Sequence, residues 1–138
     1  MLADSTGATT TFTKTSDLTT GLKYSFKVRA INAVDPSPFS EIVQIIAGTI
    51  PGKPATPTKY SASVDAIEIR WTEPDNGGSV ITNYNVYWDN GVGDGNFILK
   101  GSSNGYETFT VTKTDDNLVA GRSYEFKVSA VNGVGEGP

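Results

Sequence analysis

The chain has 138 residues, of which 37% are hydrophobic and 19% are charged, and its formal net charge at pH 7 is −4. This balance predicts a globular protein and argues against a nucleic-acid partner, since nucleic-acid binding normally requires a basic patch. The sequence contains no cysteine and no histidine, which excludes disulfides, thiolate nucleophiles, imidazole bases and zinc sites built from those residues.

The N-terminal segment carries no targeting pattern. Residues 1–7 lack the basic start and the apolar run of a secretory signal. No stretch of the chain approaches the roughly 18 apolar residues of a membrane-spanning helix. We therefore expect no membrane insertion by this segment.

The first predicted element is a strand over residues 24–30, where aromatic and aliphatic residues alternate with charged or hydroxyl residues. A period of two is typical of a strand with one buried face, and we place Tyr24, Phe26 and Val28 on that face. Residues 48–57 then interrupt the alternation and hold three of the seven prolines. Because proline stiffens a chain toward an extended conformation, this segment predicts a domain boundary with a linker over residues 48–53.

Further strands are predicted over residues 67–71, 84–88 and 124–130, with a weaker one over 109–111. Turn signals rich in Asp, Asn and Gly separate them, and no segment has a convincing helical period. The sequence thus predicts an all-β protein. The side chains expected in its core are Trp71, Tyr84, Val86, Trp88, Leu118, Tyr124, Phe126 and Val128.

One motif occurs twice. The pattern Leu-x-x-Gly-x-x-Tyr-x-Phe-x-Val-x-Ala-x-Asn begins at Leu18 and again at Leu118, 100 residues later. That spacing is about the size of one small β-sandwich domain, so it indicates an array of domains rather than a short-period solenoid.

Together these features resemble the fibronectin type III family. The resemblance rests on Pro54-x-x-Pro57, on Trp71 followed by Glu73-Pro74-x-x-x-Gly78, on Ile81-x-x-Tyr84-x-Val86-x-Trp88 and on the repeated Leu-x-x-Gly-x-x-Tyr. It implies tandem immunoglobulin-like β-sandwiches in which each motif tyrosine bonds back to nearby backbone, as in a tyrosine corner.

The resemblance also implies an unusual frame. Residues 11–47 correspond to the family's strands E, F and G of one domain, with G over residues 40–47, and residues 54–132 correspond to strands A through F of the next. Residues 1–47 are then the C-terminal part of one domain, and residues 54–138 are a second domain lacking strand G.

A sandwich without strand G would expose an unpaired strand edge. The missing strands are either flanking sequence of a longer polypeptide or, in a head-to-tail assembly, a segment of another copy. The candidate strand-exchange segment contains Ile42, Val43, Ile45 and Ile46.

Catalytic chemistry finds little support. The acid pairs, Asp115 with Asp116 and Glu73 with Asp75, fall in turns, where acids are common. The loop over residues 89–96 has oxygen ligands suited to calcium but fails the EF-hand spacing, so we interpret it as a flexible hairpin. The loops over residues 33–38 and 133–138 resemble the family's F–G loops, and neither contains Arg-Gly-Asp. We expect no enzyme, cofactor or metal site, and we assign Trp71 and Trp88 to the core rather than to stacking on a sugar or base.

The sequence therefore predicts a non-catalytic structural or interaction module, a spacer or adhesion-type repeat of a larger multidomain protein. Its expected partners are proteins or neighbouring repeats of the same chain. The alternatives are a filament subunit joined by head-to-tail strand exchange and an accessory domain of a secreted carbohydrate-active enzyme. We favour an extracellular or cell-surface location, with an intracellular cytoskeletal one as the alternative.

Overall fold

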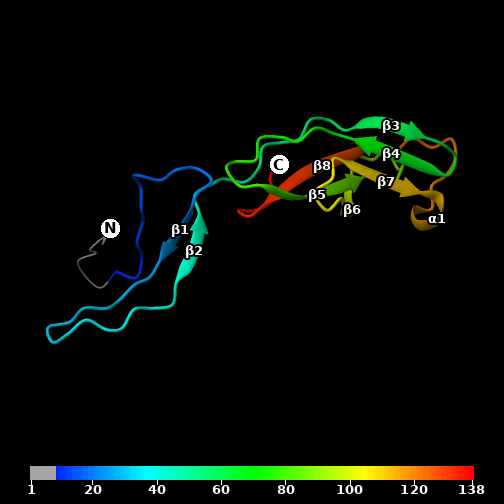
Figure 1. Cartoon of the computed structure of the whole chain (residues 1–138). Coiled ribbons are helices and arrows are strands. Elements are labelled where there is room, and N and C mark those ends of the chain that lie inside the picture. The colour runs from blue at the N-terminus through cyan, green and yellow to red at the C-terminus, as the bar shows by residue number, and fades with distance from the viewer. Residues whose placement is uncertain (1–8) are drawn as a thin grey trace.

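The structure is a computed structural model that describes residues 9–138, so the expectation for residues 1–7 lies outside the described residues. Within this range the chain forms eight strands and one short helix (Figure 1). The elements are β1 (Lys23–Phe26), β2 (Val43–Ile46), β3 (Thr58–Ala62), β4 (Ala66–Arg70), β5 (Ile81–Trp88), β6 (Ile98–Ser102), β7 (Thr108–Thr112), α1 (Lys113–Asp116) and β8 (Phe126–Asn132).

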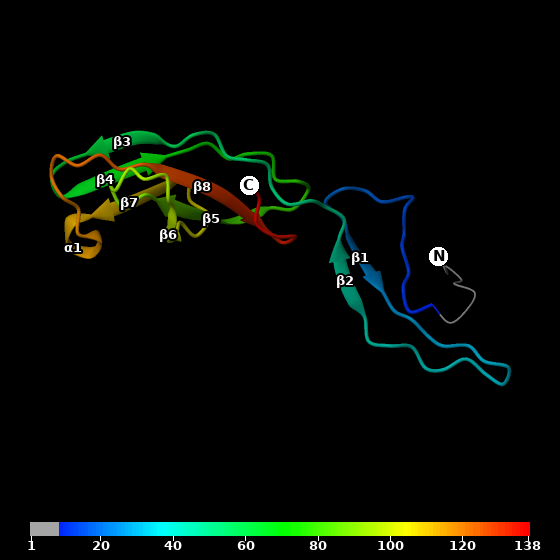
Figure 2. The ribbon, with the colours of Figure 1, turned by 180° about the vertical axis from the view of Figure 1, so that it is seen from behind.

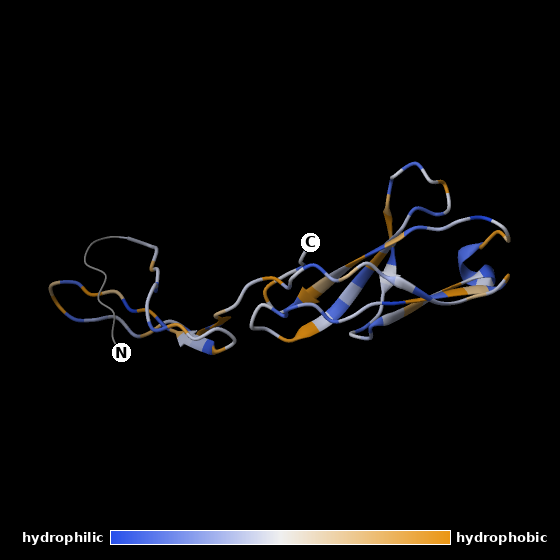
Figure 3. Cartoon of the chain, turned by 90° about the horizontal axis from the view of Figure 1, so that it is seen from above, coloured by the Kyte–Doolittle hydropathy of each residue, from blue (hydrophilic) through white to orange (hydrophobic). Residues whose placement is uncertain are grey.

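Residues 54–138 contain two antiparallel sheets of three strands each, in the orders β3-β4-β7 and β6-β5-β8. The pairing of β4 with β7 places Ile69 opposite Phe109, and the pairing of β5 with β8 places Val86 opposite Val128. Hydrophobic and hydrophilic residues alternate along the strands (Figure 3). The two sheets pack face to face through their apolar residues, so the all-β fold class is confirmed.

The core joins the two sheets through two contiguous clusters. The larger contains Ile69, Trp71, Tyr84, Val86, Val128 and Ala130, and the smaller contains Trp88, Val111 and Leu118, each less than 9% exposed. Phe126 and Tyr124 are half-buried beside them. Alternation predicted the strand residues of the expected core, because successive residues of a strand point to opposite faces, whereas Leu118 was predicted from the repeated motif. Ile69, Val111 and Ala130 were not among the predicted core residues.

The strands β1 and β2 form a separate two-stranded sheet beyond one end of this sandwich (Figures 1 and 2). The placement of Val28 in a core is wrong, since this side chain is 67% exposed and β1 ends two residues before it. Tyr24 and Phe26 are only half-buried. The physical reason is that no second sheet covers β1 and β2 within residues 9–138. Of the stretch 11–47 matched by resemblance to strands E, F and G, the part before β1 forms no strand.

A helical turn was not predicted. Thr112 caps α1 by accepting the Asp115 N–H at 3.1 Å, and Asn117 ends it in the left-handed conformation at φ 56°. This single turn depends on its caps rather than on periodicity, which four residues are too few to display.

Candidate functional site

The two copies of the sequence motif build the same tyrosine corner. The hydroxyl oxygen of Tyr24 accepts the Thr19 N–H, and that of Tyr124 accepts the Val119 N–H, both at 2.8 Å. This is the backbone bond that the resemblance implied. Each tyrosine thereby fastens the turn that leads into its strand.

The turns that follow β1 and β8 are also built alike. In both, the Oδ1 atom of the motif asparagine, Asn32 or Asn132, accepts the N–H groups two and three residues further on, at 2.8 and 3.1 Å. A single β-bridge closes each turn, between Ile31 and Pro36 and between Val131 and Glu136. The two copies of the motif therefore share local hydrogen bonding as well as sequence.

Glu136 fastens the second of these turns to the outer face of the β6-β5-β8 sheet. Its carboxylate accepts the Ser129 hydroxyl and, at 2.9 Å, the Tyr87 hydroxyl. The bond from Ser129 holds the pKa of Glu136 below its usual value, and donation to Glu136 raises the pKa of Tyr87. The sequence carries no signal for this cluster, because an acid within a glycine-rich segment has no distinctive spacing.

The hairpin over residues 89–96 is organised by a buried carboxylate. Asp89 is 4% exposed, and it accepts the N–H groups of Gly91 at 2.8 Å, Glu125 at 2.9 Å and Gly93 at 3.1 Å. Burial alone would raise the pKa of Asp89, but these bonds outweigh it and hold the pKa below its usual range. Among residues 9–138, no three His, Cys, Asp or Glu side chains gather in a way that could hold a metal ion.

Three of the four paired acids serve local structure. Asp115 accepts the Thr112 hydroxyl at 2.9 Å, while Asp116 accepts the Thr112 N–H at 2.7 Å and forms an ion pair with Lys100. Asp75 accepts the Gly77 N–H of its own loop at 2.8 Å. These bonds satisfy turn and cap backbone groups, a common use of acids in turns.

The two tryptophans lie inside the sandwich. Trp88 stacks on Tyr124 with ring centroids 5.6 Å apart, and Trp71 meets Tyr84 edge-on at 5.4 Å. Burial, with a smaller contribution from Glu107 and Glu73, raises the pKa of Tyr84 to about 12. Neither indole offers a free face to a sugar or a base.

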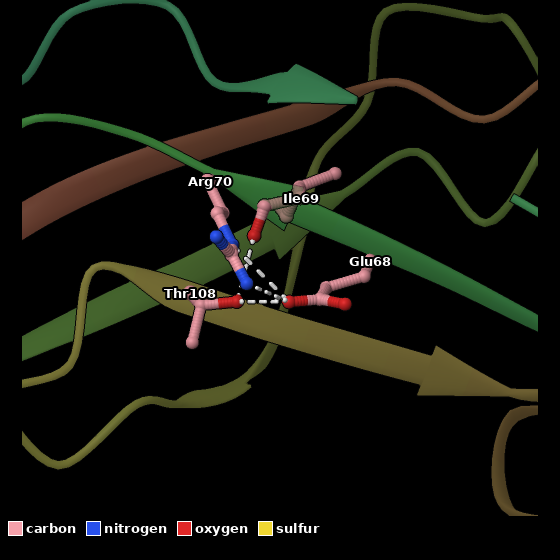
Figure 4. A network of polar contacts seen from close by, with 4 residues as sticks. All are labelled: Glu68, Ile69, Arg70 and Thr108. Atoms are coloured by element: carbon pink, nitrogen blue, oxygen red, sulfur yellow. Dashed lines mark hydrogen bonds and ion pairs between the residues drawn. The ribbon is translucent and has the colours of Figure 1, made fainter. Parts of the chain in front are cut away.

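The outer face of the β3-β4-β7 sheet carries a polar network (Figure 4). Glu68 Oε1 accepts the Thr108 hydroxyl at 3.0 Å and pairs with the Arg70 guanidinium at 3.1 Å. The Arg70 guanidinium also lies 3.3 Å from the centroid of the Tyr60 ring. The network links all three strands and gives this face both signs of charge.

The candidate strand-exchange segment is paired within its own chain. In β2, Val43 lies opposite Phe26 and Ile45 opposite Tyr24. Ile42, Val43 and Ile45 are 63%, 54% and 53% exposed, while Ile46 is half-buried. Within the part of the chain that the structure describes, the outer edge of β2 has no strand partner.

Three comparisons place these features among known proteins. A family model described as the fibronectin type III domain matches residues 53–138. Ephrin type-B receptor 2 of Gallus gallus is 33% identical over 130 residues, covering 88% of this chain and 12% of the receptor. Myomesin-2 of Homo sapiens is 36% identical over 127 residues, covering 86% of this chain and 8% of that protein.

Among solved structures, domains A168–A170 of titin align over 83% of this chain and 37% of that one, with a TM-score of 0.64 and 28% identity. A structure of titin kinase and its flanking domains aligns over 64% of this chain with a TM-score of 0.54 and 30% identity. The chain thus spans about a tenth of the two curated relatives. Across residues 9–138, no helix has the length and apolar character needed to cross a membrane.

Proposed function

The chain belongs to the fibronectin type III family, and from that premise we propose that it is a spacer or adhesion-type repeat of a larger multidomain protein. Of the residues that could have carried chemistry, the aspartates Asp75, Asp89, Asp115 and Asp116 are engaged in turns and caps, and Trp71 and Trp88 lie in the core. The family membership and the relatives support a non-catalytic module. The proposed division is a C-terminal part of one domain over residues 1–47, a linker over 48–53 and a second domain over 54–138.

The observation that carries this proposal is the double construction of one unit. Tyrosine corner, strand and asparagine-centred turn recur 100 residues apart with hydrogen bonds of the same lengths. Catalysis does not require this unit to occur twice, whereas an array of repeated domains contains one such unit in every domain. A repeat of this kind holds other domains apart or presents them to protein partners.

The location remains part of the proposal. One relative is named as a receptor and another as a myomesin, which supports both an extracellular or cell-surface setting and an intracellular cytoskeletal one. We propose the former as the first to test, by surface biotinylation of intact cells that make the native protein.

The repeat role is tested by the intact mass of the native polypeptide under denaturing conditions, together with peptide sequencing of the segments that flank this chain. We expect a mass far above 14.6 kDa and further fibronectin type III repeats on both sides. A mass near that of this chain would contradict the proposal. A flanking catalytic fold would instead support the accessory role.

A filament subunit is the second candidate, and the exposed side chains of Ile42, Val43 and Ile45 beside an open strand edge favour it. It predicts sedimentation coefficients that rise with concentration and a loss of this rise in an Ile45→Lys variant. Sedimentation as a monomer at every concentration would reject the filament.

A further inference from the structure

Four segments meet where the β1-β2 sheet joins the sandwich. They are the turn at residues 20–21, the linker at residues 48–52, the loop at residues 75–79 and the turn at residues 132–135. We call these four segments together the joint, the β1-β2 sheet with its turns the first unit, and the sandwich the second unit. We propose that the joint fixes the two units in one orientation and that Asn132 is its positioning residue. This inference deepens the proposed repeat function and rests on it.

Asn132 connects three of the four segments. Its side chain is 6% exposed, and its carboxamide nitrogen donates to the Thr49 carbonyl at 2.8 Å and to the Asn76 carbonyl at 2.9 Å. Its Oδ1 atom accepts the two N–H groups of its own turn. One buried carboxamide thus uses both donors and its acceptor to tie the linker, the loop and the turn together.

The linker is bound along its length rather than free. The Thr49 N–H donates to the Gly77 carbonyl at 2.9 Å, and the Gly52 N–H donates to the Asp75 carbonyl at 2.8 Å. Pro51, between them, is fully buried. A linker held at both ends of a buried proline transmits orientation, whereas a free one would allow the units to move independently.

The turn of the first unit touches the loop of the second through its backbone and through the Thr20 methyl group, which lies over Gly78. Gly21 and Gly78 have φ of +84° and +83°, and a Cβ atom added to Gly21 would lie 2.8 Å from the Gly78 carbonyl oxygen. Glycine is therefore required at Gly21 by conformation and by contact alike. Such close packing against the backbone has little freedom to slide.

The repeat supplies matched controls for both features. Gly121, the motif counterpart of Gly21, has φ +83° but open space around its added Cβ atom. Asn32 makes the same two Oδ1 bonds as Asn132, and within residues 9–138 its carboxamide nitrogen donates to no acceptor. Each pair shares its local backbone geometry, and only one member of each pair contacts the joint, where Asn132 is buried while Asn32 is exposed.

The test is a distance distribution between two nitroxide labels, measured by double electron–electron resonance on the full chain. The absence of native cysteine allows labels at Glu41→Cys and Lys59→Cys, one on each side of the joint. A second label pair, Lys59→Cys with Glu125→Cys, lies within the sandwich and sets the width expected of one rigid body. We expect both distributions to be equally narrow.

Asn132→Asp keeps the acceptor of the turn and removes both donors to the other segments, and Gly21→Ala disturbs the joint from the first unit. We expect each variant to widen the distance distribution across the joint by about twofold. In Asn32→Asp and Gly121→Ala we expect the width of that distribution to equal the width in the parent chain. The label pair within the sandwich, measured in the same variants, shows that the sandwich is intact.

A broad distribution in the parent chain overturns the proposal, whichever segment moves. So does a narrow distribution in both joint variants, or equal widening in the two controls. A flexible joint would leave the repeat function standing, while a native mass near 14.6 kDa would remove that function and leave the joint unaffected. The two failures are therefore distinguishable.

Discussion

Replacing Asp89 by asparagine removes the charge from a side chain that is 4% exposed and accepts three backbone N–H groups. The asparagine oxygen can still face Gly91 and Glu125, but its nitrogen then points at the Gly93 N–H, where two donors oppose each other. Hydrogen bonds to a charged acceptor contribute about 1.5–3 kcal/mol each, so we expect the free energy of unfolding to fall by about 2–3 kcal/mol at pH 7.

The pH dependence follows from the direction of the pKa shift. The pKa of Asp89 lies below its usual value in the folded protein. The stabilisation is therefore complete above the unfolded pKa of about 3.9 and is lost as the pH falls through the lowered folded value. The parent should therefore exceed Asp89→Asn in free energy of unfolding by its full amount at pH 7. This difference should shrink as the pH falls toward the lowered folded pKa.

Urea unfolding followed by tryptophan fluorescence measures this difference at a series of pH values. Asp94→Asn is the matched control, because Asp94 lies in the same hairpin and bonds only to Asn96. We expect that variant to unfold close to the parent. An equal deficit of Asp89→Asn throughout the series, or an equal loss in Asp94→Asn, would refute the role of the buried charge.

Three further changes probe the sandwich by the same unfolding assay. Trp71→Ala should lower the free energy of unfolding by about 3–5 kcal/mol, because it empties a buried aromatic site. Tyr124→Phe should cost about 1 kcal/mol, because the Val119 N–H loses its acceptor. Lys100→Met should cost about 1–2 kcal/mol, between the values for exposed and buried pairs, because it leaves the largely buried Asp116 carboxylate without its cation. Losses within experimental error would contradict each assignment.

The sequence was informative wherever the structural signal is local. Alternation with a period of two predicted β4, β5, β7 and β8 to within a few residues. The reason is that a strand with one buried face has apolar and polar residues in alternate positions. The bonds of the motif tyrosines could also be predicted from the sequence, since Tyr124 bonds to a residue only five positions away.

Features that depend on partners far away in the sequence could not be predicted from it. Asn132 was visible as the last residue of a repeated motif, yet its partners Thr49 and Asn76 are 83 and 56 positions away, and no spacing rule links them. The exposure of Val28 was missed because alternation shows which residues share a face and not whether another sheet covers it. The ion pair of Lys100 with Asp116 joins β6 to α1, two elements whose meeting only the fold determines.

The bound linker has a practical consequence for limited proteolysis. Proteases normally nick the exposed connection between two domains, and fragment ends are then taken as domain boundaries. Here Pro51 and Pro54 are buried, and Lys53, the basic residue between them, precedes a proline, a bond that trypsin cleaves poorly. For a protease of broad specificity, the loop over residues 33–38 is the more accessible site, since Val34 is 85% exposed; trypsin has no Lys or Arg to cleave there. Fragments would then begin inside the first unit and carry the linker with the second, so boundaries drawn from them would divide a repeat instead of separating two.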